Sequence, residues 1–237
     1  MPTSARSSAT SAEYCYDPSR ARGAAPQGGR PTWGGPAWVA AVTTVVAVRK
    51  DGQVAMAADS LVTFGDTRLS HRSEANRKLF TLDSAVGRSL FATAGAAAHL
   101  PVLRHALAAL PKEELRLAGK DELFHTFTRL HLLLKESFFL QTKEDDNDPY
   151  ESSQFSVLLA NASGIFGIYS YREVFEFKQF WSIGSGRPFA LGAMHAVYDK
   201  ARSAREVAQA GVAAGCEYDR NSAGPVELLT LKIKTSQ

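Results

Sequence analysis

Threonine and aspartate mark the two ends of one short stretch, residues 43–60, which reads TTVVAVRKDGQVAMAADS. A threonine hydroxyl is a poor nucleophile unless a base removes its proton. The α-amine of an N-terminal residue has a pKa of roughly 7.7–8.0, so it is partly neutral near pH 7 and can be that base. Thr43 would therefore carry its own base if it became the first residue. On their own, a Thr-Thr pair at a strand start is commonplace for its β-propensity, and a strand-ending Asp59 is most often a turn former.

Other catalytic patterns find little support in the sequence. It contains no G-x-S-x-G and no H-E-x-x-H, and the GSG of residues 184–186 lacks the ending of a phosphate-binding P-loop. His125 and His131 would lie on different faces of a helix, which is typical of packing residues. Cys15 and Cys216 stand apart with no metal-ligand spacing. The cysteine usage favours a reduced, cytoplasmic protein, and no metal enzyme is expected.

Length and charge further narrow the classes of protein to which the chain can belong. The 237 residues suffice for one full-sized core, and the net charge is only +3. Residues 1–42 hold four Arg against Glu13 and Asp17, so they contribute +2 and leave +1 for the rest. Such a balance argues against a nucleic-acid partner. No apolar run approaches the roughly 18 residues that cross a bilayer, and no secretory signal begins the chain, so we expect a soluble protein without a membrane partner.

The first 42 residues differ in composition from the rest. They hold half of the prolines and no lysine, and consist mostly of Ala, Ser, Gly, Pro and Arg. Such a segment cannot bury enough apolar area to offset chain entropy. We therefore expect residues 1–42 to be a disordered tail, and residues 43–237 to form the domain.

Within the domain, strands and helices come in groups. Asp51-Gly52 predicts a hairpin turn between two strands that carry small and β-branched residues on both faces, as in a sheet buried between layers. The polar, acidic residues 143–151 predict a solvated loop. Patterns of period two predict further strands at 89–95, 153–161, 164–171, 173–186 and 225–233, and apolar residues three and four apart predict helices at 98–110, 121–141, 188–200 and 203–216. This grouping favours an α+β fold, a four-layer αββα sandwich with two antiparallel sheets between helix layers.

Five segments, taken in order, resemble those of proteasome β subunits and of the bacterial HslV peptidase, members of the N-terminal nucleophile hydrolases. They are TTVVAVRKDGQVAMAADS, RKLFTLD, ATAGAAA, IGSGRPFALGA and YDRNSAGPV. The resemblance covers residues 43–234, excludes the tail, and points to the betaproteobacterial proteasome homologue group. It implies the four-layer fold and a threonine peptidase whose nucleophile is Thr43.

The resemblance also assigns the residues that activate the nucleophile. Asp59 aligns without a gap with the family aspartate, which pairs with a lysine whose ammonium lowers the cost of charge on the threonine oxygen. Lys78 in RKLFTLD is expected to be that lysine, although it requires a three-residue insertion in residues 69–76. Arg77 is the competing cation, but it does not readily lose a proton and its planar fork has a different geometry.

Further site residues follow from the same alignment. Gly95 matches the glycine whose N–H donates to the oxyanion, and Ser185 matches the serine beside the nucleophile. Thr63 and Thr93 fall where the family borders its substrate channel. Asp219 and Ser222 match the residues that complete the hydrogen bonds around the threonine. The reaction needs no cofactor or metal, and a structural cation near Cys216, Asp219 and Ser222 is the alternative that the resemblance leaves open.

This chemistry requires that residues 1–42 be absent. Self-cleaving proteasome precursors usually place glycine before the threonine, whereas Val42 stands here, and a β-branched residue resists the required geometry. We expect translation to begin at Val42, read as methionine from an alternative start codon, and removal of that methionine to expose Thr43. A regulatory or localising pro-segment is the rival interpretation.

The expected product is a threonine-type endopeptidase subunit that assembles with itself into stacked rings in the cytoplasm. An ATPase unfoldase could supply it with unfolded polypeptides. Two other classes remain open: a non-catalytic structural ring subunit, and a small-molecule amidase of the same fold.

Overall fold

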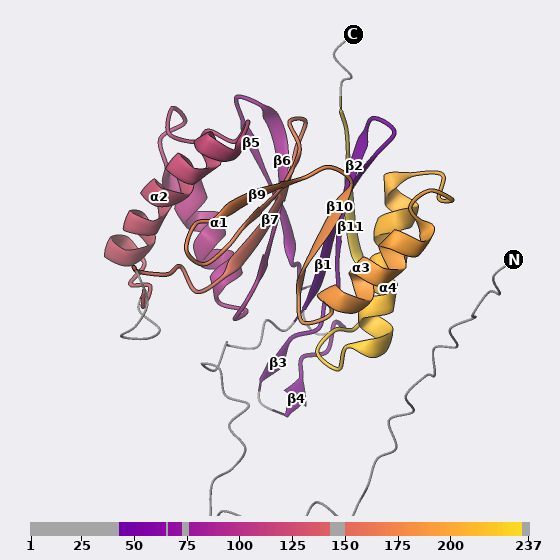
Figure 1. Cartoon of the computed structure of the whole chain (residues 1–237). Coiled ribbons are helices and arrows are strands. Elements are labelled where there is room, and N and C mark those ends of the chain that lie inside the picture. The colour runs from indigo at the N-terminus through magenta and orange to yellow at the C-terminus, as the bar shows by residue number, and fades with distance from the viewer. Residues whose placement is uncertain (1–42, 65, 73–75, 143–149, 234–237) are drawn as a thin grey trace, which may run out of the picture. The chain divides into compact units, whose positions relative to one another are not determined.

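The computed structural model describes residues 43–64, 66–72, 76–142 and 150–233 (Figure 1). All of them lie in the second of the two units into which the chain divides, Pro36–Gln237. The expected tail and residues 143–149 of the expected acidic loop lie outside the described residues. The strands are β1 (Thr44–Lys50), β2 (Gln53–Ala58), β3 (Thr63–Phe64), β4 (Thr67–Arg68), β5 (Leu79–Ser84), β6 (Gly87–Ala94), β7 (Ser156–Ala160), β8 (Ile165–Ile168), β9 (Val174–Phe177), β10 (Phe180–Gly184) and β11 (Glu227–Lys232). The helices are α1 (His99–Ala109), α2 (Lys120–Ser137), α3 (Arg187–Val197) and α4 (Ala204–Tyr218).

Two antiparallel sheets face each other between two pairs of helices (Figure 1). One sheet has the strand order β10-β1-β2-β11, and the other has the order β5-β6-β7-β8-β9. Helices α1 and α2 pack on the outer face of the second sheet, and α3 and α4 on the outer face of the first. A third apolar core, which includes Met56, Leu90 and Leu158, fills the space between the sheets. The predicted four-layer αββα sandwich is confirmed.

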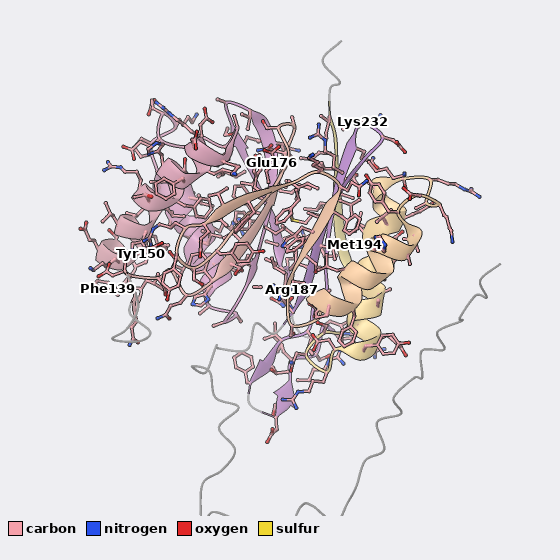
Figure 2. All side chains as sticks on the ribbon, in the orientation of Figure 1. Phe139, Tyr150, Glu176, Arg187, Met194 and Lys232 are labelled. Carbon is pink, nitrogen blue, oxygen red and sulfur yellow. The ribbon has the colours of Figure 1, made fainter. Side chains whose placement is uncertain are left out.

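The helices bury the faces that their sequence spacing predicts. On α2, Leu123, Phe127, Leu130 and Leu134 recur three and four residues apart and are all buried. On α3, the fully buried Met194, labelled in Figure 2, packs toward the first sheet. Helix α4 begins after Ser203, whose side chain accepts a hydrogen bond from the N–H of Glu206.

The β1–β2 hairpin confirms the predicted turn. Asp51 and Gly52 have φ angles of 49° and 69°, the two positive values that a type I′ turn requires. Antiparallel pairing then sets Val45 opposite Ala58. Because Thr43 lies just before β1 and Asp59 just after β2, the hairpin brings its two ends to the same edge of the sheet.

Two predictions about strands were incomplete. Residues 173–186 do not form one strand: they form β9 and β10, which belong to different sheets. The consecutive polar residues Lys178 and Gln179 interrupt the alternation at this bend, but no Gly or Pro marks a turn there, and the prediction ran through it. Strand β5 and the short ribbon β3–β4 were not predicted, because each is too short or too mixed in character to give a clear period.

Candidate active site

The centre of the site is the open end of the β1–β2 hairpin. Thr43 is 2% exposed and Asp59 is fully buried. The Asp59 carboxylate accepts a hydrogen bond of 2.9 Å from the N–H of Thr44, and the Asp59 N–H donates to the Thr44 carbonyl at 3.2 Å. The hydroxyl of Thr43 donates to Asp59 Oδ1 over 2.5 Å. The sixteen-residue spacing therefore brings a hydroxyl and a carboxylate into direct contact.

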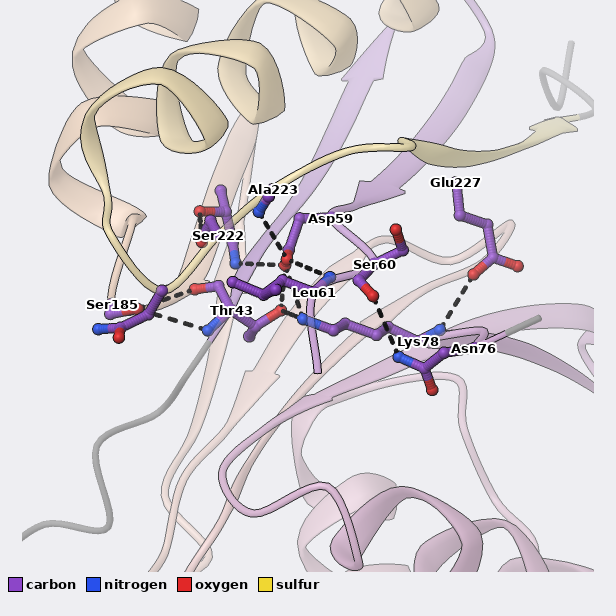
Figure 3. Close-up of polar contacts among 12 residues, drawn as sticks. Thr43, Asp59, Ser60, Leu61, Asn76, Lys78, Ser185, Ser222, Ala223 and Glu227 are labelled. Carbon is purple, nitrogen blue, oxygen red and sulfur yellow. Dashed lines mark hydrogen bonds and ion pairs between the residues drawn. The ribbon is translucent and has the colours of Figure 1, made fainter. Parts of the chain in front are cut away.

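Lys78 completes a triangle with these two residues (Figure 3). Its Nζ lies 2.8 Å from Thr43 Oγ1 and 2.8 Å from Asp59 Oδ1. The backbone N–H of Lys78 donates to the carboxylate of Glu227 at 3.0 Å, which fixes the residue where β5 begins. Burial lowers the pKa of the Lys78 ammonium, and the neighbouring Asp59 carboxylate partly opposes this effect. The ammonium can therefore release a proton more readily than an exposed lysine.

Asp59 is held entirely by donors. Besides the contacts of Oδ1, its Oδ2 accepts from the backbone N–H groups of Leu61 at 2.9 Å and Ala223 at 3.2 Å. These donors satisfy the hydrogen-bonding capacity of the buried carboxylate. Asp59 is thus a fixed acceptor under the hydroxyl and ammonium groups.

On the other side of Thr43 lies a second polar group, built from the loops before α3 and after α4. The backbone N–H of Thr43 donates to Ser185 Oγ over 3.4 Å. Ser185 and Ser222 both donate to Asp219 Oδ2, over 2.6 and 2.7 Å. The site residues expected there, Ser185, Asp219 and Ser222, therefore form one hydrogen-bonded chain that ends at the nitrogen of Thr43.

Gly184 allows the backbone of Thr43 to lie close to the loop that carries Ser185. Its φ is +97°, and a Cβ at this position would overlap the carbonyl group of Thr43. That carbonyl accepts a hydrogen bond from the N–H of Gly186 at 3.3 Å and lies 3.4 Å from Ser185 Oγ, whose proton goes to Asp219. A glycine is thus required by both conformation and space.

A cavity of about 250 Å³ opens in front of the hydroxyl, and it holds the remaining expected residues. Gly95, Thr63 and Thr93 line it together with Thr43 and Lys78. Gly95 has a φ of +150°, and a Cβ there would lie 2.7 Å from Nδ1 of His99. Apart from Asn76, the other described residues of the lining are apolar: Leu61, Val62, Ala96, Ala97 and Leu100. The cavity therefore gives an uncharged side chain access to the hydroxyl.

The structural cation that the resemblance leaves open near Cys216, Asp219 and Ser222 stays a prediction. Asp219 is occupied by the two serine hydroxyls, and Cys216 is a free thiol. Burial and the nearby Asp59 carboxylate raise the pKa of the Cys216 thiol to about 11, so the thiol stays protonated. Among the residues that the structure describes, no cluster of three or more His, Cys, Asp or Glu could hold a metal ion.

Sequence reasoning missed three contributors. Glu227 anchors the backbone of both Lys78 and Leu79, the latter at 3.2 Å. The Thr44 hydroxyl pairs with Ser222 Oγ at 2.7 Å. Asn76 lines the cavity and donates to the carbonyl of Ser60 at 3.4 Å. Only the second threonine of the Thr-Thr pair could have drawn attention from the sequence, because the other two act through contacts between distant segments.

Comparisons with known proteins identify the family to which the chain belongs. The structure of the Thiobacillus denitrificans protein BPH matches the chain at 36% identity with a TM-score of 0.73, over 82% of this chain and 100% of that one. The same protein in complex with epoxomicin matches at 36% identity with a TM-score of 0.72, over 81% of this chain and 100% of that one. The chain belongs to the proteasome/HslV-like family of N-terminal nucleophile hydrolases. It is a homologue of proteasome-like β subunits.

Two further matches are more distant. The structure of HslV from Trypanosoma brucei shares the fold at 20% identity, with a TM-score of 0.57 over 80% of this chain and 99% of that one. The ATP-dependent protease subunit HslV of Syntrophobacter fumaroxidans is 50% identical over 38 residues, which is 16% of this chain and only 21% of that protein. No family model matches the chain. In the described ranges, no helix has the length and apolar character needed to cross a membrane.

Proposed function

We propose that this chain is a threonine-type endopeptidase subunit in which Thr43, freed of residues 1–42, is the nucleophile. The observation that carries the proposal is the contact of the Thr43 hydroxyl with both Lys78 Nζ and Asp59 Oδ1 at one end of an accessible cavity. A hydroxyl held against an ammonium and a carboxylate is poised to lose its proton, which is the first requirement for attack on a carbonyl.

The proposed reaction uses groups of this chain alone. With residues 1–42 removed, the Thr43 amine takes the hydroxyl proton while Oγ1 attacks the peptide carbonyl. The N–H of Gly95 donates to the oxyanion that forms. The C–N bond then breaks, the amine returns its proton to the leaving nitrogen, and an ester remains on Thr43. Water hydrolyses that ester by the same proton path in reverse. No cofactor takes part.

The surrounding residues have supporting roles in this proposal. The Lys78 ammonium stabilises negative charge on Oγ1, and its lowered pKa keeps the proton exchangeable. Ser185, which lies 3.4 Å from the Thr43 nitrogen, and Asp219, which accepts from Ser185, would orient the free amine. Thr63 and Thr93, at the wall of the cavity, would border the bound polypeptide.

Assembly and location extend the proposal. We infer that the subunit forms stacked homo-oligomeric rings in the cytoplasm, and that an ATPase unfoldase supplies polypeptides. The name of the Syntrophobacter relative, an ATP-dependent protease subunit, supports the ATPase. Residues 43–237 would form the mature subunit.

The test is covalent labelling of protein purified from its own cells. Intact mass gives the N-terminal residue, and incubation with epoxomicin, the ligand in one BPH structure, reports a free amine next to a reactive hydroxyl. We expect one adduct on Thr43, and cleavage of unfolded polypeptides that Thr43→Ala abolishes. Thr230→Ala, an exposed threonine of β11, is the matched control and should retain both.

Each other outcome favours a different class. A free Thr43 that forms no adduct points to a non-catalytic ring subunit. Turnover of a small amide without cleavage of polypeptides points to an amidase of the same fold. Polypeptide digestion by mature protein in which Thr43 remains acylated would refute the proposed chemistry.

A further inference from the structure

A second cavity of about 660 Å³ lies directly beside the first, between α1 and the strands β5 and β11. The two cavities share the lining residues Asn76, Ala97 and Leu100. They are thus separated by a single layer of side chains. An extended peptide advances roughly 3.4 Å per residue, so two or three residues span such a layer. A polypeptide bound at Thr43 can reach the second cavity, which we call the lateral groove.

The lateral groove has the charge of an anion-binding site. Arg77, Arg104 and His105 line it, and all three are exposed. Within the described part of the chain, neither guanidinium forms a hydrogen bond or ion pair. The acidic residue of the lining, Glu227, already accepts the backbone N–H groups of Lys78 and Leu79. The groove therefore presents two unpaired guanidinium groups, each able to bind a carboxylate through two parallel hydrogen bonds.

Three consecutive residues join the lateral groove to the nucleophile. Asn76 lines both cavities, Arg77 lines the groove alone, and Lys78 lines the first cavity alone. In Figure 3, the Lys78 side chain reaches toward Thr43 while its backbone nitrogen faces Glu227. Residues 76–78 thus place one cationic side chain at each cavity. The hydrogen bond from Lys78 to Glu227 holds this stretch of chain in position between the two cavities.

The first cavity has the opposite preference. Among the described residues that line it, Lys78 alone is charged, and its ammonium is engaged by Asp59 and by Thr43. Most of its other lining is apolar, so a charged substrate side chain would lose hydration there without gaining a partner. On the proposed function, a neutral residue would fit next to the cleaved bond, and an acidic residue would fit only beyond it.

We propose that the subunit selects polypeptides that carry Asp or Glu two or three residues from a neutral cleavage-site residue, with Arg77 and Arg104 binding the carboxylate. This inference rests on the proposed peptidase function and names its substrate class. The attraction is between partly exposed charges, so it weakens as salt screens them.

The test compares pairs of fluorogenic peptides that differ only by Glu or Gln at positions two and three on either side of the cleaved bond. We expect kcat/KM to favour Glu over Gln by roughly tenfold at one of these positions, and the ratio to shrink at high salt. Arg77→Gln with Arg104→Gln should bring the ratio close to one, and the two lysine replacements should restore part of it. Because the readout is a ratio, a general loss of activity cancels.

A matched control removes two positive charges elsewhere. Lys112→Gln with Arg205→Gln, at exposed positions that line neither cavity, should keep the full Glu preference. Epoxomicin labelling of Thr43 separates the two proposals. Labelling without any Glu preference, or a preference that survives the Arg77 and Arg104 replacements, overturns the groove proposal and leaves the peptidase intact. Absence of labelling and of peptide cleavage overturns both.

Discussion

Replacing Asp59 by asparagine tests the electrostatic arrangement under Thr43. Every partner of the carboxylate is a donor: the Thr43 hydroxyl, the Lys78 ammonium and three backbone N–H groups. An asparagine amide carries an NH₂ group in place of one carboxylate oxygen. Because both oxygen positions of Asp59 face donors, this NH₂ group would face donors in either orientation of the amide. The variant also leaves the Lys78 ammonium, 11% exposed, without its counter-charge.

The expected cost follows from these contacts. Removing one partner of a buried ion pair typically costs about 3–5 kcal/mol, because the other charge remains buried and unpaired. Lys78→Met should cost less than Asp59→Asn, since Asp59 keeps four neutral donors when the ammonium is gone. The double variant leaves no unpaired charge. Its cost should therefore fall short of the sum of the single costs by about 1–3 kcal/mol.

Urea unfolding at pH 7 measures these costs, at one fixed protomer concentration because assembly adds to apparent stability. The control is Asp83→Asn, which breaks an exposed pair with Arg88 whose side chains are 69% and 59% exposed, and which should cost at most about 1 kcal/mol. If the costs of Asp59→Asn and Lys78→Met simply add, the two residues are not coupled, and the reasoning about the site is wrong.

Three further predictions concern the same region. Because burial lowers the pKa of Lys78, the folded protein releases this proton at a lower pH than the unfolded chain does. The free energy of unfolding should therefore rise with pH just below the ordinary lysine pKa. Urea titrations between about pH 8 and 10 measure this rise, and Lys78→Met should lack it. Gly184→Ala should destabilise the protein by at least about 1–3 kcal/mol and displace Thr43, whereas Gly192→Ala, in an open position on α3, should stabilise it by about 0.5–1 kcal/mol in thermal unfolding. With a thiol pKa of about 11, Cys216 should react with iodoacetamide at pH 8 roughly a hundred times more slowly than a free cysteine, and equal rates would contradict the burial argument.

The local elements and their grouping could be predicted from the sequence alone. The Asp51-Gly52 turn, the apolar spacing of α2 and the alternating strands each depend on residues within a few positions of one another. The grouping of strands and helices then restricts the layers that can bury all the apolar faces, which is why the αββα sandwich was predictable. The two-residue turn also leaves the hairpin little freedom in its register, and this register places Thr43 and Asp59 at the same edge; Asp59 itself was assigned from the family resemblance.

The contacts of distant side chains with Thr43 depend on the packing of the whole domain. Lys78 is 35 residues away and Ser185 is 142 residues away, and their contacts depend on how the two sheets and the loops between them pack. The same packing sends Arg77 into the lateral groove and uses Glu227 to hold the chain between the two cavities. Local patterns carry no information about such contacts, because each one is fixed by burial and hydrogen bonding between segments that are far apart in the chain.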